Sequence, residues 1–170
     1  MSIKINYSKK TNGTANGNLV LFVDEKFNIN GVKKYLSNSE FSYISDLLKT
    51  SDLKKNLFVF EVNSKRKIVL ISIKKNLKSF DIENLGAEFY GRANYRKNSE
   101  YFLNSESIIK THENFIGHFL HGLKLKSYEF NKYKSKKDGK VICIIVTGNK
   151  NQPSAQSQLK FKALEEGIFY

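Results

Sequence analysis

The three histidines of the chain, which fall between residues 112 and 121, are the first side chains to test for chemistry. On a helix, His118 and His121 would lie three positions apart on one face, where two imidazoles could bind a metal ion together. No acidic or cysteine side chain sits beside them at a useful spacing, and residues 112–118 lack the i, i+4 histidine pair of the zinc-peptidase helix. We therefore expect His118 and His121 to be solvated surface residues, and His112 to be half-buried.

Nucleophilic and phosphate chemistry find equally little support. The single cysteine, Cys143, lies in the apolar run KVICIIVTG (140–148), where we expect a buried and unreactive thiol. Gly31, Gly86 and Gly91 stand alone, so no glycine-rich loop is available to hold a phosphate. The acidic residues are scattered rather than paired. We therefore predict no catalytic residue, no metal-binding residue and no bound cofactor in these 170 residues.

The stretch HGLKLKSYEFNKYKSKKDGK (121–140) is basic and aromatic, as a nucleic-acid-binding arm would be. Its candidate polyanion contacts are Lys132, Lys134, Lys136, Lys137 and Lys140. The alternative is packing by Tyr128, Phe130 and Tyr133, in which Tyr128 and Phe130 fold back beneath a helix end while the lysines face water. We favour packing, and expect any nucleic-acid binding by this stretch to be weak and non-specific.

The net charge of +13 and the pI near 9.7 attract polyanions in general. Only Arg66, Arg92 and Arg96 among the 29 basic residues are arginines, although specific phosphate recognition favours the bidentate guanidinium. A coding sequence rich in A and T would also produce this abundance of lysine, asparagine and isoleucine. The charge alone is therefore weak support for nucleic-acid binding.

Six short apolar runs predict β-strands, at 3–7, 19–23, 57–62, 67–74, 100–104 and 140–148. The second, fourth and sixth are nearly continuous in apolar residues, which is typical of central strands covered on both faces. The first alternates apolar and polar residues and is expected at an edge. Strands alternating with helices predict an α/β fold, with a mixed β-sheet flanked by helices on both faces.

Helical spacing of apolar residues predicts two helices in the first half of the chain. One covers 41–48 after cap candidates at 37–39, and the next covers 82–93 from an N-cap at Ser79. Gly86 and Ala93 are small enough to let the second helix lie close to the sheet.

Two further helices are predicted in the second half. The third runs from a cap at Ser105 or Ser107 through 108–123, and the fourth begins at Pro153 and includes Leu159, Ala163 and Leu164 in its apolar pattern. The fourth reaches the last residues without a cap, so we expect the chain to be part of a longer protein.

The basic and aromatic stretch resembles the segment that ends the long N-terminal-domain helix of the leucyl (cytosol) aminopeptidases, which are hexameric two-metal exopeptidases. The matching residues are Gly122, Leu125, Tyr128, Phe130, Tyr133, Lys134 and Ser135. Three more segments agree with that family in order and spacing: KIVLISIKKN (67–76), IENLGAEFYGRA (82–93) and LKFKALEEGIFY (159–170). Ser72, Lys74 and Lys75 depart from it, because the family has glycines after the corresponding strand.

The resemblance implies a macro-domain-like, three-layer fold for residues 1–150, and the start of a linker helix at 151–170. The family holds its catalytic side chains and its two divalent metal ions, manganese or zinc, in a C-terminal domain with no counterpart here. The resemblance thus implies a non-catalytic domain that supports hexamer assembly and access of peptide substrates to the catalytic domain.

Two other functions remain open. The net charge favours a nucleic-acid-binding module, and kinship with macro domains suggests a nucleotide or ADP-ribose binder, against which the missing phosphate loops count. No window has the length and apolar content of a signal peptide or a membrane span, so we expect a cytoplasmic protein without a membrane partner.

Overall fold

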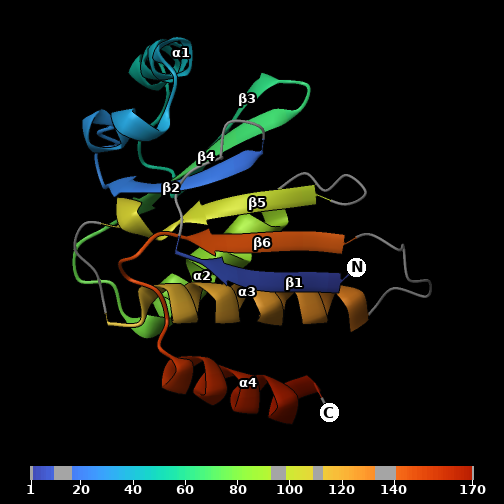
Figure 1. Ribbon diagram of the computed structural model, residues 1–170. Helices are drawn as coiled ribbons and strands as arrows, with labels where there is room; N and C mark the ends of the chain where they lie inside the picture. The colour runs from blue at the N-terminus through green and yellow to red at the C-terminus, as the bar shows by residue number, and fades with distance from the viewer. Residues whose placement is uncertain (1, 10–16, 93–98, 109–112, 133–140, 170) are drawn as a thin grey trace.

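The sheet that organises the molecule is seen in a computed structural model, which describes residues 2–9, 17–92, 99–108, 113–132 and 141–169 (Figure 1). Within these ranges six strands form one sheet in the order β1-β6-β5-β2-β4-β3, parallel throughout except for the antiparallel pair β3–β4. The strands are β1 (Ser2–Ser8), β2 (Asn18–Asp24), β3 (Leu57–Asn63), β4 (Arg66–Ile73), β5 (Ser99–Asn104) and β6 (Val141–Thr147). The predicted mixed sheet is confirmed, with β1 at one edge and β2, β4 and β6 inside.

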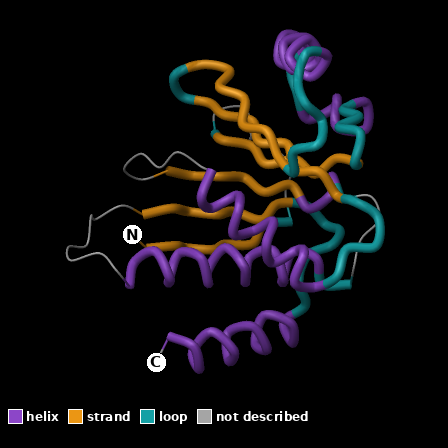
Figure 2. Tube along the Cα trace, turned by 180° about the vertical axis from the view of Figure 1, so that it is seen from behind, coloured by secondary structure: helices purple, strands orange, loops and turns teal. Residues whose placement is uncertain are grey.

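One face of the sheet is covered by α2 (Ser79–Arg92) and α3 (Phe115–Lys132), which lie together behind it in Figure 1 and in front of it in Figure 2. The ring of Phe22 on β2 meets Phe115 and Phe119 of α3 edge-on, with centroids 5.3 and 5.5 Å apart. Burial of these large side chains is the main force that holds the helices to the sheet.

The opposite face is covered by the 3-10 helix η2 (Asn30–Tyr35) and by α1 (Asn38–Lys49). Val32, Ile44 and Leu48 from these elements pack with Leu19 and Leu21 of β2. The α/β fold with helices on both faces is therefore confirmed. No residue of β6 belongs to this second cluster.

The uncovered side of β6 explains the state of the cysteine. Ile142, Ile144 and Val146 are buried against α3, whereas Cys143 on the other face is only half-buried and lies 3.8 Å from the amide nitrogen of Asn6. The prediction of a fully buried thiol is wrong, because the helices of that face stop short of β6.

The two helices α2 and α3 approach so closely that each presents a glycine to the backbone of the other. A Cβ on Gly86 of α2 would overlap the carbonyl group of Phe119, and a Cβ on Gly122 of α3 would overlap the backbone of Glu83. Gly86 thus packs against a helix, and the prediction that it lies against the sheet is wrong. Ala93, the other small residue of that prediction, lies outside the described residues.

The start of α3 also differs from the prediction. The helix begins at Phe115, and Ser105 and Ser107 are buried in a separate 3-10 helix, η3 (Ser105–Ser107), because their hydroxyls bond to the sheet instead. The Ser107 hydroxyl accepts a hydrogen bond from the Phe22 N–H at 2.9 Å and donates one to the Asn104 carbonyl at 2.7 Å. These serines therefore do not cap the long helix.

At the other helix starts, Ser37 caps α1 as expected. Its hydroxyl accepts from the Glu40 N–H at 3.1 Å, and the Glu40 carboxylate accepts from the Ser37 N–H at 3.0 Å. Ser79 is already inside α2, because the carbonyl of Lys78 accepts the first bonds of that helix.

Within the described ranges, no helix is long and apolar enough to cross a membrane.

Candidate functional site

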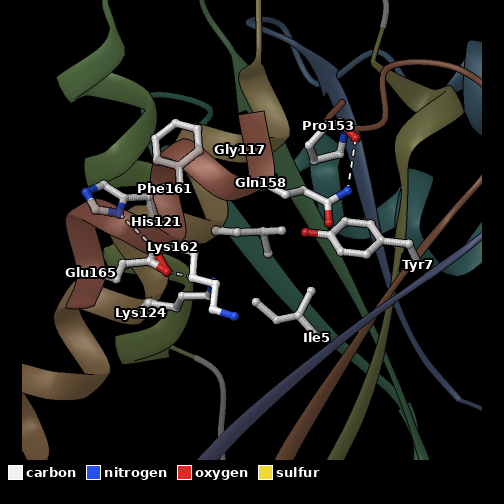
Figure 3. Close-up of a pocket in the computed structure, with 11 residues that line it drawn as sticks. Ile5, Tyr7, Gly117, His121, Lys124, Pro153, Gln158, Phe161, Lys162 and Glu165 are labelled. Atoms are coloured by element: carbon white, nitrogen blue, oxygen red, sulfur yellow. Dashed lines mark hydrogen bonds and ion pairs between the residues drawn. The ribbon is translucent and has the colours of Figure 1, made fainter. Parts of the chain in front are cut away.

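A cavity of about 300 Å³ lies between the edge strand β1, the helix α3 and the last helix, α4 (Ala155–Phe169). Figure 3 shows side chains from all three elements around it. Its lining residues are Ile5, Tyr7, Gly117, Leu120, His121, Lys124, Pro153, Gln158, Phe161, Lys162 and Glu165. Sheet edge, core helix and terminal helix, which are far apart in sequence, thus meet at one hollow.

The helix α4 packs against α3 with a largely polar face. Phe161 and Glu165 are buried there, while Leu159 and Leu164 are 67% and 48% exposed. The ring of Phe161 fits because Gly117 of α3 has no side chain: a Cβ there would stand 2.6 Å from the ring. A helix is confirmed here, but it begins at Ala155 rather than at Pro153 as predicted, and its apolar pattern does not mark the buried face.

The polar contacts between α3 and α4 centre on the carboxylate of Glu165. It lies 3.0 Å from Nδ1 of His121 and accepts a hydrogen bond from the Lys124 ammonium at 2.8 Å. Burial acts to raise the pKa of Glu165, but the hydrogen bonds from His121 and Lys124 outweigh it and hold that pKa below the ordinary value of 4.5. The buried carboxylate is therefore ionised at neutral pH and ties the two helices together.

A second carboxylate, Glu83 of α2, faces the same histidines. Its oxygens lie 3.4 Å from Nδ1 of His118 and 3.9 Å from Nε2 of His121. His121 is 6% exposed, and both imidazoles contact the ring of Phe161. The prediction of solvated surface histidines is wrong, because α4 covers them and Glu83 comes from a helix that sequence spacing does not relate to them.

This cluster joins the helices by an ion pair between Lys124 and Glu165 and by close polar contacts of the two histidines with Glu83 and Glu165. No group of three or more histidine, cysteine or acidic side chains in the described ranges is arranged to hold a metal ion. His112, the third histidine, lies outside the described residues.

At the carboxyl ends of the parallel strands, where α/β sheets commonly bind ligands, two loops close on one another instead. The Ser105 hydroxyl donates to the Thr147 carbonyl at 2.6 Å, and the Glu106 carboxylate accepts from the Asn149 N–H at 3.1 Å. The Asn151 side-chain amide donates to the Ser105 carbonyl at 3.2 Å. These hydrogen bonds hold the two loops to one another.

Of the residues singled out by the resemblance, Gly122, Leu125 and Tyr128 lie on α3. The helix continues to Lys132, so Tyr128 does not fold back beneath its end as predicted; it stands half-buried on the helix itself. The side chains of Phe130 and Lys132 and all of Tyr133, Lys134, Ser135, Lys136, Lys137 and Lys140 lie outside the described residues. The polyanion-contact prediction therefore stays a prediction.

Sequence reasoning missed the side chains that meet at the cavity, among them Tyr7, Lys124, Lys162 and Glu165. The one available signal was the i, i+4 series of Ser157, Phe161 and Glu165, which marks the inner face of α4. The leucines of the same helix, Leu159 and Leu164, are more apolar than this series and suggested a different buried face.

No protein-family model matches the sequence, and no curated protein matches it. Solved structures do match in fold. A tomato leucine aminopeptidase mutant superposes with a TM-score of 0.61 at 16% sequence identity, over 96% of this chain and 36% of that chain. For the cytosol aminopeptidase of Coxiella burnetii the TM-score is 0.56 at 10% identity, over 96% of this chain and 31% of that one. For the macrodomain of Thermus aquaticus DarG the TM-score is 0.48 at 10% identity, over 85% of this chain and 99% of that chain.

Because the sequence identities are only 16% and 10%, the likeness to the two aminopeptidases establishes the fold alone. It confirms, at the level of fold, the resemblance that the residues of α3 suggested. The chain spans about a third of the length of the solved aminopeptidases that it matches.

Proposed function

We propose that this chain is the non-catalytic N-terminal domain of a longer leucyl-aminopeptidase-like protein of the cytoplasm, a metalloexopeptidase that releases N-terminal amino acids from peptides. The observation that carries the proposal is the structural match over 96% of this chain, which occupies only 36% and 31% of the two aminopeptidases. The glycine of the sequence motif, Gly122, also has a definite role in the fold, at the crossing of α2 and α3. The motif is therefore consistent with a shared architecture.

In this proposal the chain contributes structure, and peptide hydrolysis belongs to the remainder of the longer protein. That remainder would hold two divalent metal ions, manganese or zinc. The domain would support assembly of a hexamer and access of peptides to the catalytic domain. The helix α4, which ends the described chain with exposed leucines, would lead toward that remainder.

The test compares residues 1–170 with the longer gene product in turnover of leucine p-nitroanilide, each with added Mn²⁺ or Zn²⁺ and with a chelator. We expect metal-dependent turnover by the longer product alone, and a hexamer by analytical ultracentrifugation. Turnover by the 170-residue chain, or none by a metal-loaded longer product, would contradict the proposal.

A nucleic-acid-binding module is the alternative, supported by the net charge of +13. Non-specific binding weakens steeply with salt, because lysines release counterions from the phosphates. Under our proposal any binding to a DNA or RNA duplex disappears by roughly physiological salt, about 0.15 M. Tight binding that survives this salt would favour the module.

A further inference from the structure

The cavity between β1, α3 and α4 contains two hydrogen-bond donors that have no acceptor among the described residues. The Tyr7 hydroxyl and the Lys162 ammonium make no hydrogen bond or ion pair there, and both residues line the cavity. Tyr7 is 38% exposed, so a solute can reach it. Burial first, and the charge of Glu165 second, raise the pKa of Tyr7 above its ordinary 10, so that the hydroxyl keeps its proton at neutral pH.

The charges around the cavity leave an excess of one cation. The carboxylate of Glu165 is compensated by Lys124 at 2.8 Å, and His121 also lies against it at 3.0 Å. Lys162 has no acidic partner in the described part of the chain, and Figure 3 shows its side chain extending from α4 toward the strand side that carries Ile5. An anion placed at Lys162 would therefore meet an uncompensated ammonium, while the charge of Glu165 still reaches the Tyr7 hydroxyl.

The rest of the wall is apolar. Ile5 of β1, Leu120 of α3 and Phe161 of α4 line the hollow. Figure 3 shows Pro153 at one end of it. The Gln158 amide nitrogen donates to the Pro153 carbonyl at 3.1 Å, which fixes that end. A volume of about 300 Å³ is at the lower limit of small-molecule sites, which favours a small ligand.

We propose that this cavity binds a small organic carboxylate with a branched aliphatic or aromatic body. The carboxylate lies between the Lys162 ammonium and the Tyr7 hydroxyl, which both donate to it, and the body packs against Leu120 and Phe161. A charge-assisted hydrogen bond supplies the preference for an anion, and the apolar wall supplies the preference for a hydrocarbon body. The proposal concerns a surface of this chain alone and does not depend on peptidase activity.

The experiment titrates the ¹⁵N-labelled chain with 4-methylpentanoate and follows amide chemical shifts by NMR. We expect saturable shifts at Leu120 and Phe161, with a Kd on the order of 1 mM. Lys162→Gln should weaken binding by about tenfold, because a charge-assisted hydrogen bond is lost. Tyr7→Phe should weaken it by a few fold while keeping the ring. Lys160→Gln, the matched control on the exposed side of α4, should bind as the unchanged chain does.

The neutral analogue 4-methylpentanamide distinguishes anion binding from simple hydrophobic uptake. It should bind at least several fold more weakly than the carboxylate, because it leaves the ammonium unpaired. The proposal is overturned if the amide binds as tightly as the acid, or if Lys160→Gln weakens binding as much as Lys162→Gln. It is also overturned if no saturable shift occurs at these residues up to about 10 mM.

Discussion

Replacing Gly86 by alanine tests whether the contact between α2 and α3 sets the geometry of the whole helical layer. The added Cβ would overlap the Phe119 carbonyl group and approach the Leu123 nitrogen, which are backbone atoms that a side-chain rotation cannot move. The two helices must therefore separate, and separation loosens the packing of the buried side chains Ile82 and Phe89.

Two opposing contributions decide the size of the effect. Alanine favours a helix over glycine by up to about 1 kcal/mol, whereas overpacking costs typically 1–3 kcal/mol. Because the obstruction at Gly86 is backbone, we take the upper end, which leaves a net loss of about 2 kcal/mol. In a domain of this size that corresponds to a fall in Tm of roughly 4–8 °C.

The matched control is Gly91→Ala, on the same helix, where a Cβ would meet nothing within 4 Å. It should raise Tm by about 1–3 °C through the helix preference alone. Thermal melts followed by circular dichroism measure both variants. A Gly86→Ala variant that melts at or above the Tm of the unchanged chain would refute the close helix crossing.

Three further changes test other parts of the structure. Arg66→Met should lower the free energy of unfolding in urea by about 3–5 kcal/mol, because it leaves the buried carboxylate of Glu40, 2.7 Å from Arg66 Nε, without its cationic partner. The double variant with Glu40→Leu should recover much of that stability. Ser107→Ala should cost about 1–3 kcal/mol in the same assay, because the Phe22 N–H loses its acceptor, and an unchanged urea midpoint would argue against that bond. Glu165→Gln should lower Tm at neutral pH, and the difference in Tm from the unchanged chain should disappear in melts below about pH 4.5. Because the pKa of Glu165 is lowered in the folded state, its contribution to stability is present above the ordinary pKa and is lost as pH falls through the pKa of the folded state. A difference in Tm that does not depend on pH would contradict the ion pairing of Glu165.

The strands were predictable because each is specified by its own residues. Apolar runs such as LVLFV (19–23) and KIVLISIK (67–74) can be buried only between two covering layers, so their central place follows from local composition. The alternating residues at 3–7 likewise indicate an edge. The antiparallel pairing of β3 with β4 follows from the short connection, Ser64–Lys65, between them.

The helical side of the fold was less predictable because the decisive contacts join residues distant in sequence. His121 looks like a surface residue on its own helix, and it is buried only because Glu83 and Glu165 approach it from two other helices. The serines Ser105 and Ser107 have the composition of helix caps but bond to the sheet. The apolar pattern of α4 pointed to Leu159 and Leu164, which are exposed, whereas the buried face carries Glu165. A buried carboxylate paired with an ammonium is not recognisable from an apolar pattern.

The same contrast bears on what the sequence motif can mean. At 16% identity, two chains can share a fold because most buried positions need only an apolar side chain of about the right size. A position where backbone meets backbone is different, since only glycine fits, and Gly122 is such a position. A helix crossing is therefore enough to explain glycine at the first position of the motif. The described part of the motif therefore agrees with the architecture that this chain shares with the solved aminopeptidases.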